Sequence, residues 1–312
     1  MAQRLDKKIV LVTRRTRLEE LISRFNTVEQ ARFYGEHLGA DFGDYEDENK
    51  TYVESMSLVT ESLREWGIVQ RIDRTFLPTY LFGPEDVVVV LGQDGLVANT
   101  LKYLDGHPVV GVNPDVKRWE GVLLPFVGKD IRKVMQEVIH RKRAIKHITM
   151  ARVDLNNGQT LHGVNDLFIG PRTHTSARYS IEIDGKTENH SSSGIIVSTG
   201  LGSTGWFRSI IAGALGVTQG FRGESFPMES DINFPWDAEY LHFSVREPFP
   251  SKTSAADLVF GTVKKGQPLK LISQMPENGV IFSDGIESDF LEFNSGTKAE
   301  INVADKQGML VV

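Results

Sequence analysis

The sequence predicts an α/β + β fold, with an N-terminal doubly wound parallel-sheet domain and a C-terminal β-rich domain. The 312 residues suffice for about two domains of ~150 residues each. In the first half, short apolar runs alternate with helical spacing, which is typical of right-handed βαβ units. In the second half, short strands follow one another between turns. We expect domains at 1–145 and 146–312, and leave open whether the last segment packs back on the first domain.

The clearest element is Val87–Leu91, four valines and a leucine. This run is too short for a helix and too apolar for an exposed strand, so it predicts the buried central strand of a parallel sheet. Other strands of this domain are expected at Lys8–Thr13, Ile68–Ile72 and Pro108–Val112. Helices are expected at about Arg17–Arg24, with its continuation through Val28–Leu38 left open, and at Thr51–Trp66, Leu96–Leu104 and Lys129–His140. The acidic, glycine-containing stretch Gly39–Lys50 predicts a surface loop.

The second domain is expected to begin after a basic linker at Arg141–Lys146. Its strands are expected at Ile148–Leu155, Thr160–Ile169, Ala177–Ile183, Gly194–Thr199, Leu241–Val245, Leu269–Ile272, Gly279–Ser283 and Lys298–Val303. One helix is expected near Ser203–Leu215. This pattern predicts a mostly β domain.

The composition is that of an ordinary globular protein, with 40% apolar and 24% charged residues. The net charge of −6 argues against a general nucleic-acid partner. The absence of cysteine excludes disulfides, thiol nucleophiles and Cys-ligated zinc. No run approaches ~20 apolar residues and the N-terminus does not resemble a signal peptide, so we expect a cytoplasmic protein without a membrane partner. His162, His174 and His190 lack ligand spacing, so no protein metal site is expected.

Asp94 is the first candidate for chemistry. It follows the Val87–Leu91 strand within Gly92-Gln93-Asp94-Gly95 and precedes a helix. That position is the carboxyl end of a parallel strand, where open α/β sheets bind ligands. The N–H groups of a helix start suit a phosphate, and a carboxylate among them suits a base or a magnesium partner. The alternative is an ordinary turn aspartate between two glycines.

A second candidate is the segment from Thr199 to Trp206. Gly200, Gly202 and Gly205 satisfy the G-x-G-x-x-G spacing, and Glu224 lies about twenty residues on, which is the dinucleotide fingerprint of a dehydrogenase. Hydroxyl groups accompany the glycines at Ser198, Thr199, Ser203 and Thr204. Trp206 could stack on a planar ring. The alternative is a Gly/Ser turn that caps a helix, with Trp206 in the core.

A third candidate is the pair Asn165-Asp166, which closes a predicted strand. Such a pair is usually a turn-former. An amide beside a carboxylate also offers both a donor and acceptors, which suits two ribose hydroxyls or an adenine edge.

Taken together, these motifs resemble the NAD kinase family. That family carries a Gly-Gly-Asp-Gly loop, an Asn-Glu or Asn-Asp pair, and a Gly/Thr/Ser-rich loop, and this chain has the three in the same order. Further segments are similar to the branch that includes the mitochondrial NAD kinases: Gly111-Val112-Asn113-Pro114-Asp115, Glu120-Gly121, Leu124-Pro125, Ser192-Ser193-Gly194, Phe243–Pro248 and Ser283-Asp284-Gly285. The resemblance runs from about Lys8 to the C-terminus.

The resemblance implies a two-domain NAD kinase-like fold and transfer of the ATP γ-phosphoryl group to the 2′-hydroxyl of the adenosine ribose of NAD, giving NADP. By the same resemblance, Asp94 is the base, Mg²⁺ arrives with ATP, and Gly92, Gln93 and Gly95 form the donor-phosphate loop. The expected NAD-binding residues are Asn165, Asp166, Ser193, Thr199, Gly202, Ser203, Thr204, Gly205, Trp206 and Ser209. Homodimers or homotetramers are common in the family.

Four positions depart from the family pattern. Gln93 replaces the second glycine of the loop, Leu96 replaces a usual threonine, and Gly205 and Trp206 replace alanine and tyrosine. If the lost glycine needs a positive φ, Gln93 would be strained, and if it needs a close approach to phosphate, Gln93 would block the site. Two alternatives therefore stay open: a related kinase of a lipid, a sugar or another nucleotide, and a non-catalytic NAD-binding homologue.

Overall fold

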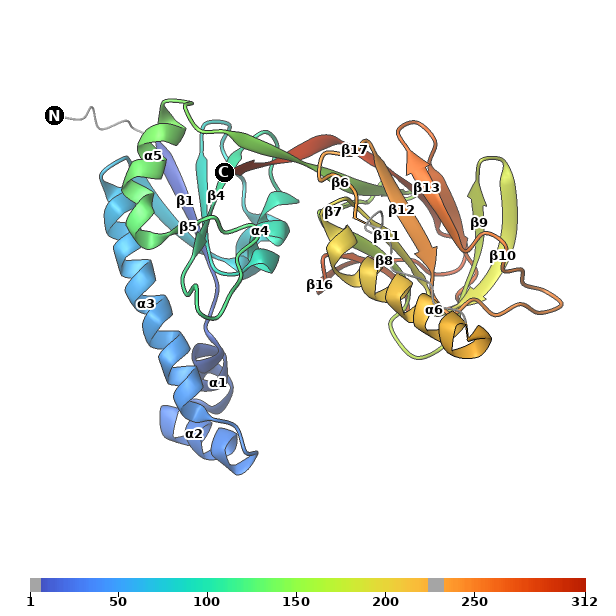
Figure 1. The fold of residues 1–312 in the computed structure, drawn as a ribbon, viewed down its shortest axis with the longest axis horizontal. Coiled ribbons are helices and arrows are strands. Elements are labelled where there is room, and N and C mark those ends of the chain that lie inside the picture. Colours follow the sequence, from blue (N-terminus) through green and yellow to red (C-terminus); the bar gives the residue numbers. More distant parts are fainter. Residues whose placement is uncertain (1–6, 224–232) are drawn as a thin grey trace. The chain divides into compact units, whose positions relative to one another are not determined.

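The computed structural model describes residues 7–223 and 233–312. The chain forms two compact units (Figure 1). The first holds the chain up to Lys146 together with Met309–Val312, and the second holds His147–Gly308. The chain therefore leaves the first unit within one strand and returns to it within another. In the part of the chain described, no helix combines the length and apolar character needed to cross a membrane.

The first unit is built on a parallel sheet with the order β17-β4-β3-β1-β2 and a short strand, β5, beside β4. Its strands are β1 (Lys8–Thr13), β2 (Ile68–Asp73), β3 (Val87–Leu91), β4 (Pro108–Asn113), β5 (Phe126–Val127) and the end of β17 (Lys298–Val311). From β1 the chain adds β2 on one side and β3 and β4 on the other. The strand order therefore reverses between β1 and β3, and ligands bind at such switch points in doubly wound sheets.

Helices cover both faces of this sheet (Figure 1). The helices of this unit are α1 (Arg17–Phe25), α2 (Val28–His37), α3 (Phe42–Arg64), α4 (Asp94–Leu101) and α5 (Ile131–Ile139), with short 3₁₀ turns at Arg74–Thr79 and Gly128–Asp130. Of these, α1 and α2 pack against the start of α3 beyond the sheet rather than on one of its faces (Figure 1). α3 and α5 pack Val59 and Met135 against Leu11 and Val89 of the sheet, and all four are fully buried. Each such side chain contributes about 1.5–3 kcal/mol of burial free energy.

The loop expected at Gly39–Lys50 is wrong, because α3 already begins at Phe42. Asp41 caps the helix by accepting a 3.0 Å hydrogen bond from the Gly43 N–H. Phe42 is buried with Leu18 and Ala31 in a small core between α1, α2 and α3. The many acidic residues made this stretch look like a loop, but they lie on a helix that the apolar residues anchor.

The second unit is a sandwich of two sheets. One sheet contains β10, β9, β14 and β17, with β6 and β7 continuing from β17, and the other has the order β13-β12-β11-β8-β15-β16. The strands of the first sheet are β6 (Ile145–Leu155), β7 (Thr160–Gly163), β9 (Ala177–Ile183), β10 (Lys186–Ser192), β14 (Leu269–Ser273) and β17. Those of the second are β8 (Asp166–Pro171), β11 (Ile195–Ser198), β12 (Tyr240–Val245), β13 (Phe260–Lys264), β15 (Gly279–Ser283) and β16 (Ile286–Glu292). Buried side chains such as Tyr179, Ile181, Ile169 and Val197 fill the space between them.

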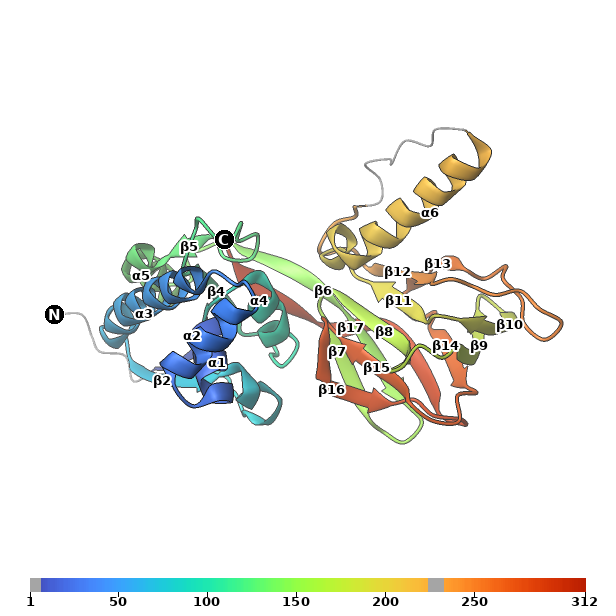
Figure 2. The same cartoon turned by 90° about the horizontal axis from the view of Figure 1, so that it is seen from below.

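Two expectations for this unit need correction. The stretch Thr160–Ile169 is not one strand, because β7 and β8 belong to different sheets and the chain turns at Val164 and Asn165. The helix α6 spans Trp206–Arg222 and follows a 3₁₀ turn at Gly202–Thr204, so it starts later and ends later than expected. Figure 2 shows α6 extending away from the sheets of its unit.

Candidate active site

Asp94 opens helix α4 at the carboxyl end of β3, as the sequence predicts. Its half-buried side chain accepts a 2.6 Å hydrogen bond at Oδ1 from the backbone N–H of Leu123. The amides of Asp94 and Gly95 have no acceptor within the helix, because they lie in its first turn. The site thus combines a carboxylate held in one orientation with free N–H groups at a helix start, which is an arrangement suited to phosphate chemistry.

The segment that follows β4 holds Leu123 in place. A Cβ on Gly111 would lie 2.0 Å from the Leu123 carbonyl oxygen, so only glycine lets this segment cross β4. Asn113 fixes both ends of the connecting loop, since its Nδ2 donates to the Trp119 carbonyl at 3.0 Å and its Oδ1 accepts from the Asp115 N–H at 2.9 Å. Gly121 turns the chain with a φ of 72°. The Gly-Val-Asn-Pro-Asp and Glu-Gly motifs therefore position the Leu123 N–H that binds the Asp94 carboxylate.

Gln93 is not strained. It has φ −123° and ψ 166°, an extended backbone that any residue adopts. The backbone at this position therefore needs no positive φ, and the condition under which Gln93 would be strained does not arise. The carbonyl of Gln93 accepts from Leu96 N–H at 2.8 Å and from Val97 N–H at 3.3 Å, so the loop still enters the helix normally.

Leu96 has become a packing residue. It is 3% exposed, and a Cβ on Gly92 would lie 2.7 Å from its Cδ2 atom. Leu96 therefore fills the space above Gly92, and Gly92 must stay a glycine to admit it. The hydroxyl that a threonine would offer at this position is lost, while the shape of the loop is kept.

In the second unit, Asn165 and Asp166 lie at the corner between β7 and β8. The carboxylate of Asp284 holds this corner, because its Oδ1 accepts from the Asn165 N–H at 2.6 Å and from the Val164 N–H at 2.9 Å. Asp284 itself has a φ of 56° in the Ser283-Asp284-Gly285 turn. Sequence reasoning had noted this turn only as a family likeness and gave it no role. Its role is to orient the Asn165-Asp166 pair.

Asp166 is 7% exposed. Burial, together with the nearby Asp284 carboxylate, raises the pKa of Asp166 to about 7. A carboxyl group with this pKa can carry a proton or accept one near neutral pH. It is therefore able to hydrogen-bond a sugar hydroxyl or a ring nitrogen in either role.

The Gly/Ser/Thr segment packs directly against this corner. The Thr199 Oγ1 donates to the Val164 carbonyl at 2.6 Å, and a Cβ on Gly202 would lie 1.9 Å from the Asn165 carbonyl oxygen. The Ser203 hydroxyl donates to the Gly200 carbonyl at 2.7 Å. Thr199 and Ser203 are fully buried. These hydroxyls therefore shape the loop, and the accessible groups of the segment are Thr204, Gly205, Trp206 and Ser209.

The dehydrogenase interpretation of the three glycines is wrong. The strand before them, β11, pairs antiparallel with β8 and β12, whereas the dinucleotide fingerprint requires a parallel βαβ unit. Gly200 and Gly202 are needed for close packing, since a Cβ on Gly200 would lie 1.9 Å from the Pro235 carbonyl oxygen. Glu224 lies outside the described residues. The helix-cap alternative also fails, because Gly205 precedes α6 without a side-chain cap.

Trp206 contributes to an aromatic cavity of about 160 Å³ on the outer face of the second sheet. Its ring stacks on Phe168 with centroids 5.7 Å apart, and the Arg246 guanidinium lies 5.5 Å from its centroid. Ser193 precedes β11, and its N–H donates to the Arg246 carbonyl at 2.9 Å, so it lies at the opposite end of β11 from Thr199. The expected dinucleotide residues of this unit therefore fall into two groups, one at each end of β11.

Within residues 7–223 and 233–312, no three His, Asp or Glu side chains lie close enough to hold a metal ion. Asp94 is a single carboxylate beside free amides. Such a site fits magnesium that is carried on the phosphates of a substrate, since Mg²⁺ commonly keeps waters and takes only one or two protein carboxylates.

No protein-family model matches the chain. A probable NADH kinase of Oryza sativa subsp. japonica is 25% identical over 268 residues, covering 77% of this chain and 75% of the rice protein. A mitochondrial NADH kinase of Saccharomyces cerevisiae is 30% identical over 129 residues, covering 39% of this chain and 31% of the yeast protein.

Two solved structures have the same fold. The yeast NADH kinase in complex with NADH has a TM-score of 0.61 at 14% identity, over 98% of this chain and 84% of the yeast chain. An NAD kinase of Archaeoglobus fulgidus in complex with ATP has a TM-score of 0.55 at 14% identity, over 97% of this chain and 93% of the archaeal chain. The ordered motifs, the sequence matches and the fold agree, and they make this chain similar to NAD and NADH kinases.

Proposed function

We propose that the protein is an NAD(H) kinase, which transfers the γ-phosphoryl group of ATP to the 2′-hydroxyl of the adenosine ribose of NAD or NADH. The observation that carries the proposal is the carboxylate of Asp94, held by the Leu123 N–H among free amides at the carboxyl end of β3. The relatives named NADH kinases and the related structures with NADH and ATP support the same substrates.

In the proposed reaction, Asp94 accepts or orients the proton of the ribose hydroxyl. A bond forms between the ribose oxygen and the γ-phosphorus, the bond to the bridging oxygen of ADP breaks, and ADP leaves. A base is needed because a sugar hydroxyl is a weak nucleophile. The amides of Gln93, Asp94 and Gly95 stabilise the charge on the transferred phosphoryl group, and magnesium bound to ATP neutralises its oxygens.

In the second unit, Asn165 and Asp166 are proposed to hydrogen-bond the ribose hydroxyls or the adenine edge. Trp206, with Thr204, Gly205 and Ser209 nearby, lines the dinucleotide. Association into homodimers or homotetramers belongs to the same proposal, and light scattering measures it. The exposed apolar side chains of α6, Val217 at 74% and Phe221 at 93%, support an association of this kind.

The experiment is a coupled assay. Purified protein is incubated with ATP, magnesium and either NAD or NADH, and the phosphorylated product is measured with an NADP-specific dehydrogenase. We expect product formation, and a loss of at least about 100-fold in kcat in Asp94→Asn. The dinucleotide Kd is expected to stay nearly unchanged, since Asp94 and the Asn165 corner belong to different units.

The matched control is Asp105→Asn, an exposed aspartate a few residues beyond the same helix, for which we expect full activity. A lipid, sugar or second nucleotide that is phosphorylated faster than NAD and NADH would favour the related-kinase alternative. Binding of NAD or NADH without turnover by the unmodified protein would favour the non-catalytic alternative. The unstrained Gln93 speaks for catalysis, because the phosphate loop keeps its shape.

A further inference from the structure

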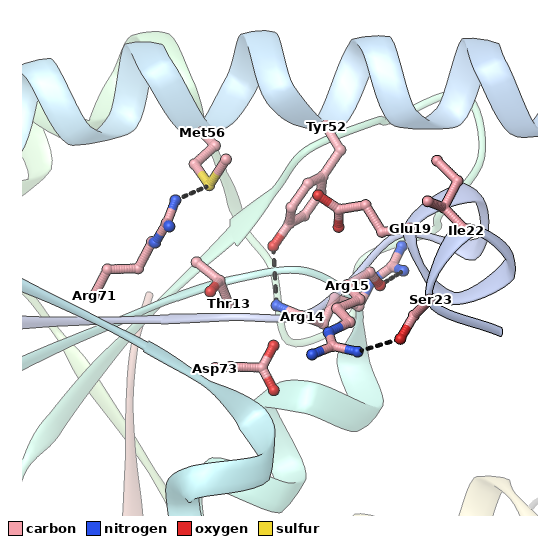
Figure 3. A pocket seen from close by; sticks show the side chains of 10 residues that line it. All are labelled: Thr13, Arg14, Arg15, Glu19, Ile22, Ser23, Tyr52, Met56, Arg71 and Asp73. Carbon is pink, nitrogen blue, oxygen red and sulfur yellow. Dashed lines mark hydrogen bonds between the residues drawn. The ribbon is translucent and has the colours of Figure 1, made fainter. Parts of the chain in front are cut away.

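A cavity of about 570 Å³ opens at the carboxyl ends of β1 and β2 in the first unit (Figure 3). None of the expected site residues lies in it. Its lining contains Thr13, Arg14, Arg15, Glu19, Ile22, Ser23, Tyr52, Met56, Arg71 and Asp73. Figure 3 shows Tyr52 and Met56 reaching down from α3, while Arg14 and Arg15 follow β1 and Arg71 lies on β2.

The cavity adjoins the Asp94 loop. β1 pairs with β3 in the register Val12↔Val90, so the residues after the two strands emerge side by side at the switch point of the sheet. Tyr52 joins the two ends directly. Its hydroxyl donates to the Leu91 carbonyl at 3.0 Å and accepts from the Arg14 N–H at 3.1 Å.

Two of the three guanidinium groups in the cavity have no carboxylate partner among residues 7–223 and 233–312. Arg14 is buried and bound to Glu48 at 2.8 Å. Arg15, by contrast, donates to the Ser23 hydroxyl at 3.2 Å, and Arg71 to the Met56 sulfur at 3.4 Å. No ion pair of either residue occurs in the described part of the chain.

The two carboxylates of the lining are engaged by the backbone. Glu19 accepts from the Thr16 N–H at 2.9 Å, and Asp73 accepts from the Thr75 N–H at 3.0 Å. Neither lies within ion-pair distance of Arg15 or Arg71 in the residues described. The negative charges of Glu19 and Asp73 would repel a polyphosphate, and the magnesium that accompanies a nucleotide would reduce this repulsion.

We propose that this cavity binds the polyphosphate chain of the phosphoryl donor, with Arg15 and Arg71 as the residues that contact it. The inference rests on the proposed function and extends it to a donor subsite. A guanidinium matches phosphate oxygens with paired N–H donors and remains charged at every working pH. The subsite also accounts for Leu96, because the phosphate contact that a threonine would make is supplied instead from the loop after β1. ATP and inorganic polyphosphate share this chemistry.

The test compares Arg15→Gln, Arg71→Gln and the double variant with the unmodified enzyme. We expect the KM for ATP to rise about ten-fold for each single variant, with the KM for NADH unchanged, because each variant removes a charged hydrogen bond to phosphate. Arg74→Gln is the matched control. Arg74 lies next to Asp73 but pairs with Glu20 at 3.3 Å and does not line the cavity, so its KM values are expected to stay the same.

Inorganic tripolyphosphate separates the two donor sources. We expect it to compete with ATP, and its affinity, measured by calorimetry, to fall about ten-fold in Arg15→Gln and Arg71→Gln. If it also supports formation of the phosphorylated dinucleotide, the cavity accepts a donor without a nucleoside. If it only inhibits, the donor is the nucleoside triphosphate. Both results support the subsite.

The subsite and the proposed function fail in different ways. An active enzyme whose variants keep both the KM for ATP and the tripolyphosphate affinity would overturn the subsite and leave the kinase assignment intact. A protein that makes no product, yet loses tripolyphosphate binding in Arg15→Gln and Arg71→Gln but not in Arg74→Gln, would retain the subsite and remove the kinase assignment. Circular dichroism of each variant confirms that it is folded.

Discussion

At the scale of single residues, the two departures in the Asp94 loop have different consequences. Gln93 keeps an extended backbone and therefore changes only the side chain that the loop presents. Leu96 is buried and fills the space above Gly92, so this position offers apolar packing in place of the hydroxyl that a threonine would carry. The position of Asp94, the proposed base, is therefore unaffected by the two substitutions. In the proposed donor subsite, Arg15 and Arg71 make the phosphate contacts that a threonine at position 96 would offer.

Asp166 makes stability depend on pH. Its pKa is about 7 in the folded chain and ~3.9 in an unfolded one. Between about pH 4 and pH 7, the folded chain holds a proton that the unfolded chain has released, so raising the pH favours unfolding. Below this window Asp166 does not lower the free energy of unfolding, and above it the decrease has reached its full size. Asp166→Asn removes the titration.

We therefore expect the free energy of unfolding of Asp166→Asn, measured relative to the unmodified protein, to rise between pH 5 and pH 8 by on the order of 2 kcal/mol. Urea unfolding at several pH values measures it. The control is Asp184→Asn, an exposed turn aspartate with φ 51°, a conformation that asparagine tolerates. An Asp166→Asn difference that stays constant with pH would show that Asp166 does not titrate in this range.

At the scale of elements, the sequence predicted most of what local pattern controls. The strand Val87–Leu91, the turn at Gly92–Gly95 and the helix that follows are all confirmed, because apolar runs and glycines act over a few residues. It could not predict that Thr160–Ile169 divides between two sheets, since the Asp284 carboxylate that holds this corner comes some 120 residues later. The hydrogen bond from the Leu123 N–H to Asp94 could not be predicted either, because a backbone donor is not visible in the pattern of side chains.

The ends of β1 and β3 are joined by the Tyr52 hydroxyl, which comes from α3. Tyr52 is 3% exposed, and both backbone groups that it satisfies are buried with it. In Tyr52→Phe the ring still packs, but the Leu91 carbonyl and the Arg14 N–H lose their partner. We expect the free energy of unfolding to fall by about 1–3 kcal/mol. We also expect a higher KM for ATP, because Arg14 and Arg15 lose their anchor.

Urea unfolding and steady-state kinetics measure the two effects of Tyr52→Phe. Tyr34→Phe is the matched control, because Tyr34 lies on the neighbouring helix α2 and is 38% exposed. Equal stability of the two variants would mean that water replaces the Tyr52 hydroxyl and that the two strand ends do not depend on it.

At the scale of the whole molecule, the motifs divide between the two units. Asp94 and the arginine cavity belong to the first, and Asn165, Asp166 and Trp206 belong to the second. The proposed donor site and the proposed dinucleotide site therefore fold on separate cores. Each unit can be perturbed by itself, which is why a change in the KM for ATP and a change in the KM for NADH report on different parts of the chain.

The C-terminus makes the first unit depend on the end of the chain. β17 pairs with β4 at Met309↔Pro108 and Leu310↔Val109, and Val311 is buried in the core of the sheet. Deleting residues 309–312 removes the end of β17 that pairs with β4 and two buried apolar side chains, Leu310 and Val311, at a cost of about 3 kcal/mol or more. We expect the β4 amides to exchange with deuterium about 100-fold faster, while the β8 amides of the second unit keep their protection.

Deleting Val312 alone is the control for this truncation. Val312 is 41% exposed, and its removal costs a single backbone bond to Ala144. That variant is expected to keep β4 protected, because β17 and its core residues stay in place. If the longer deletion also left β4 protected, the first unit would be complete without its last strand. The Asp94 loop and the arginine cavity would then depend only on the chain before residue 147.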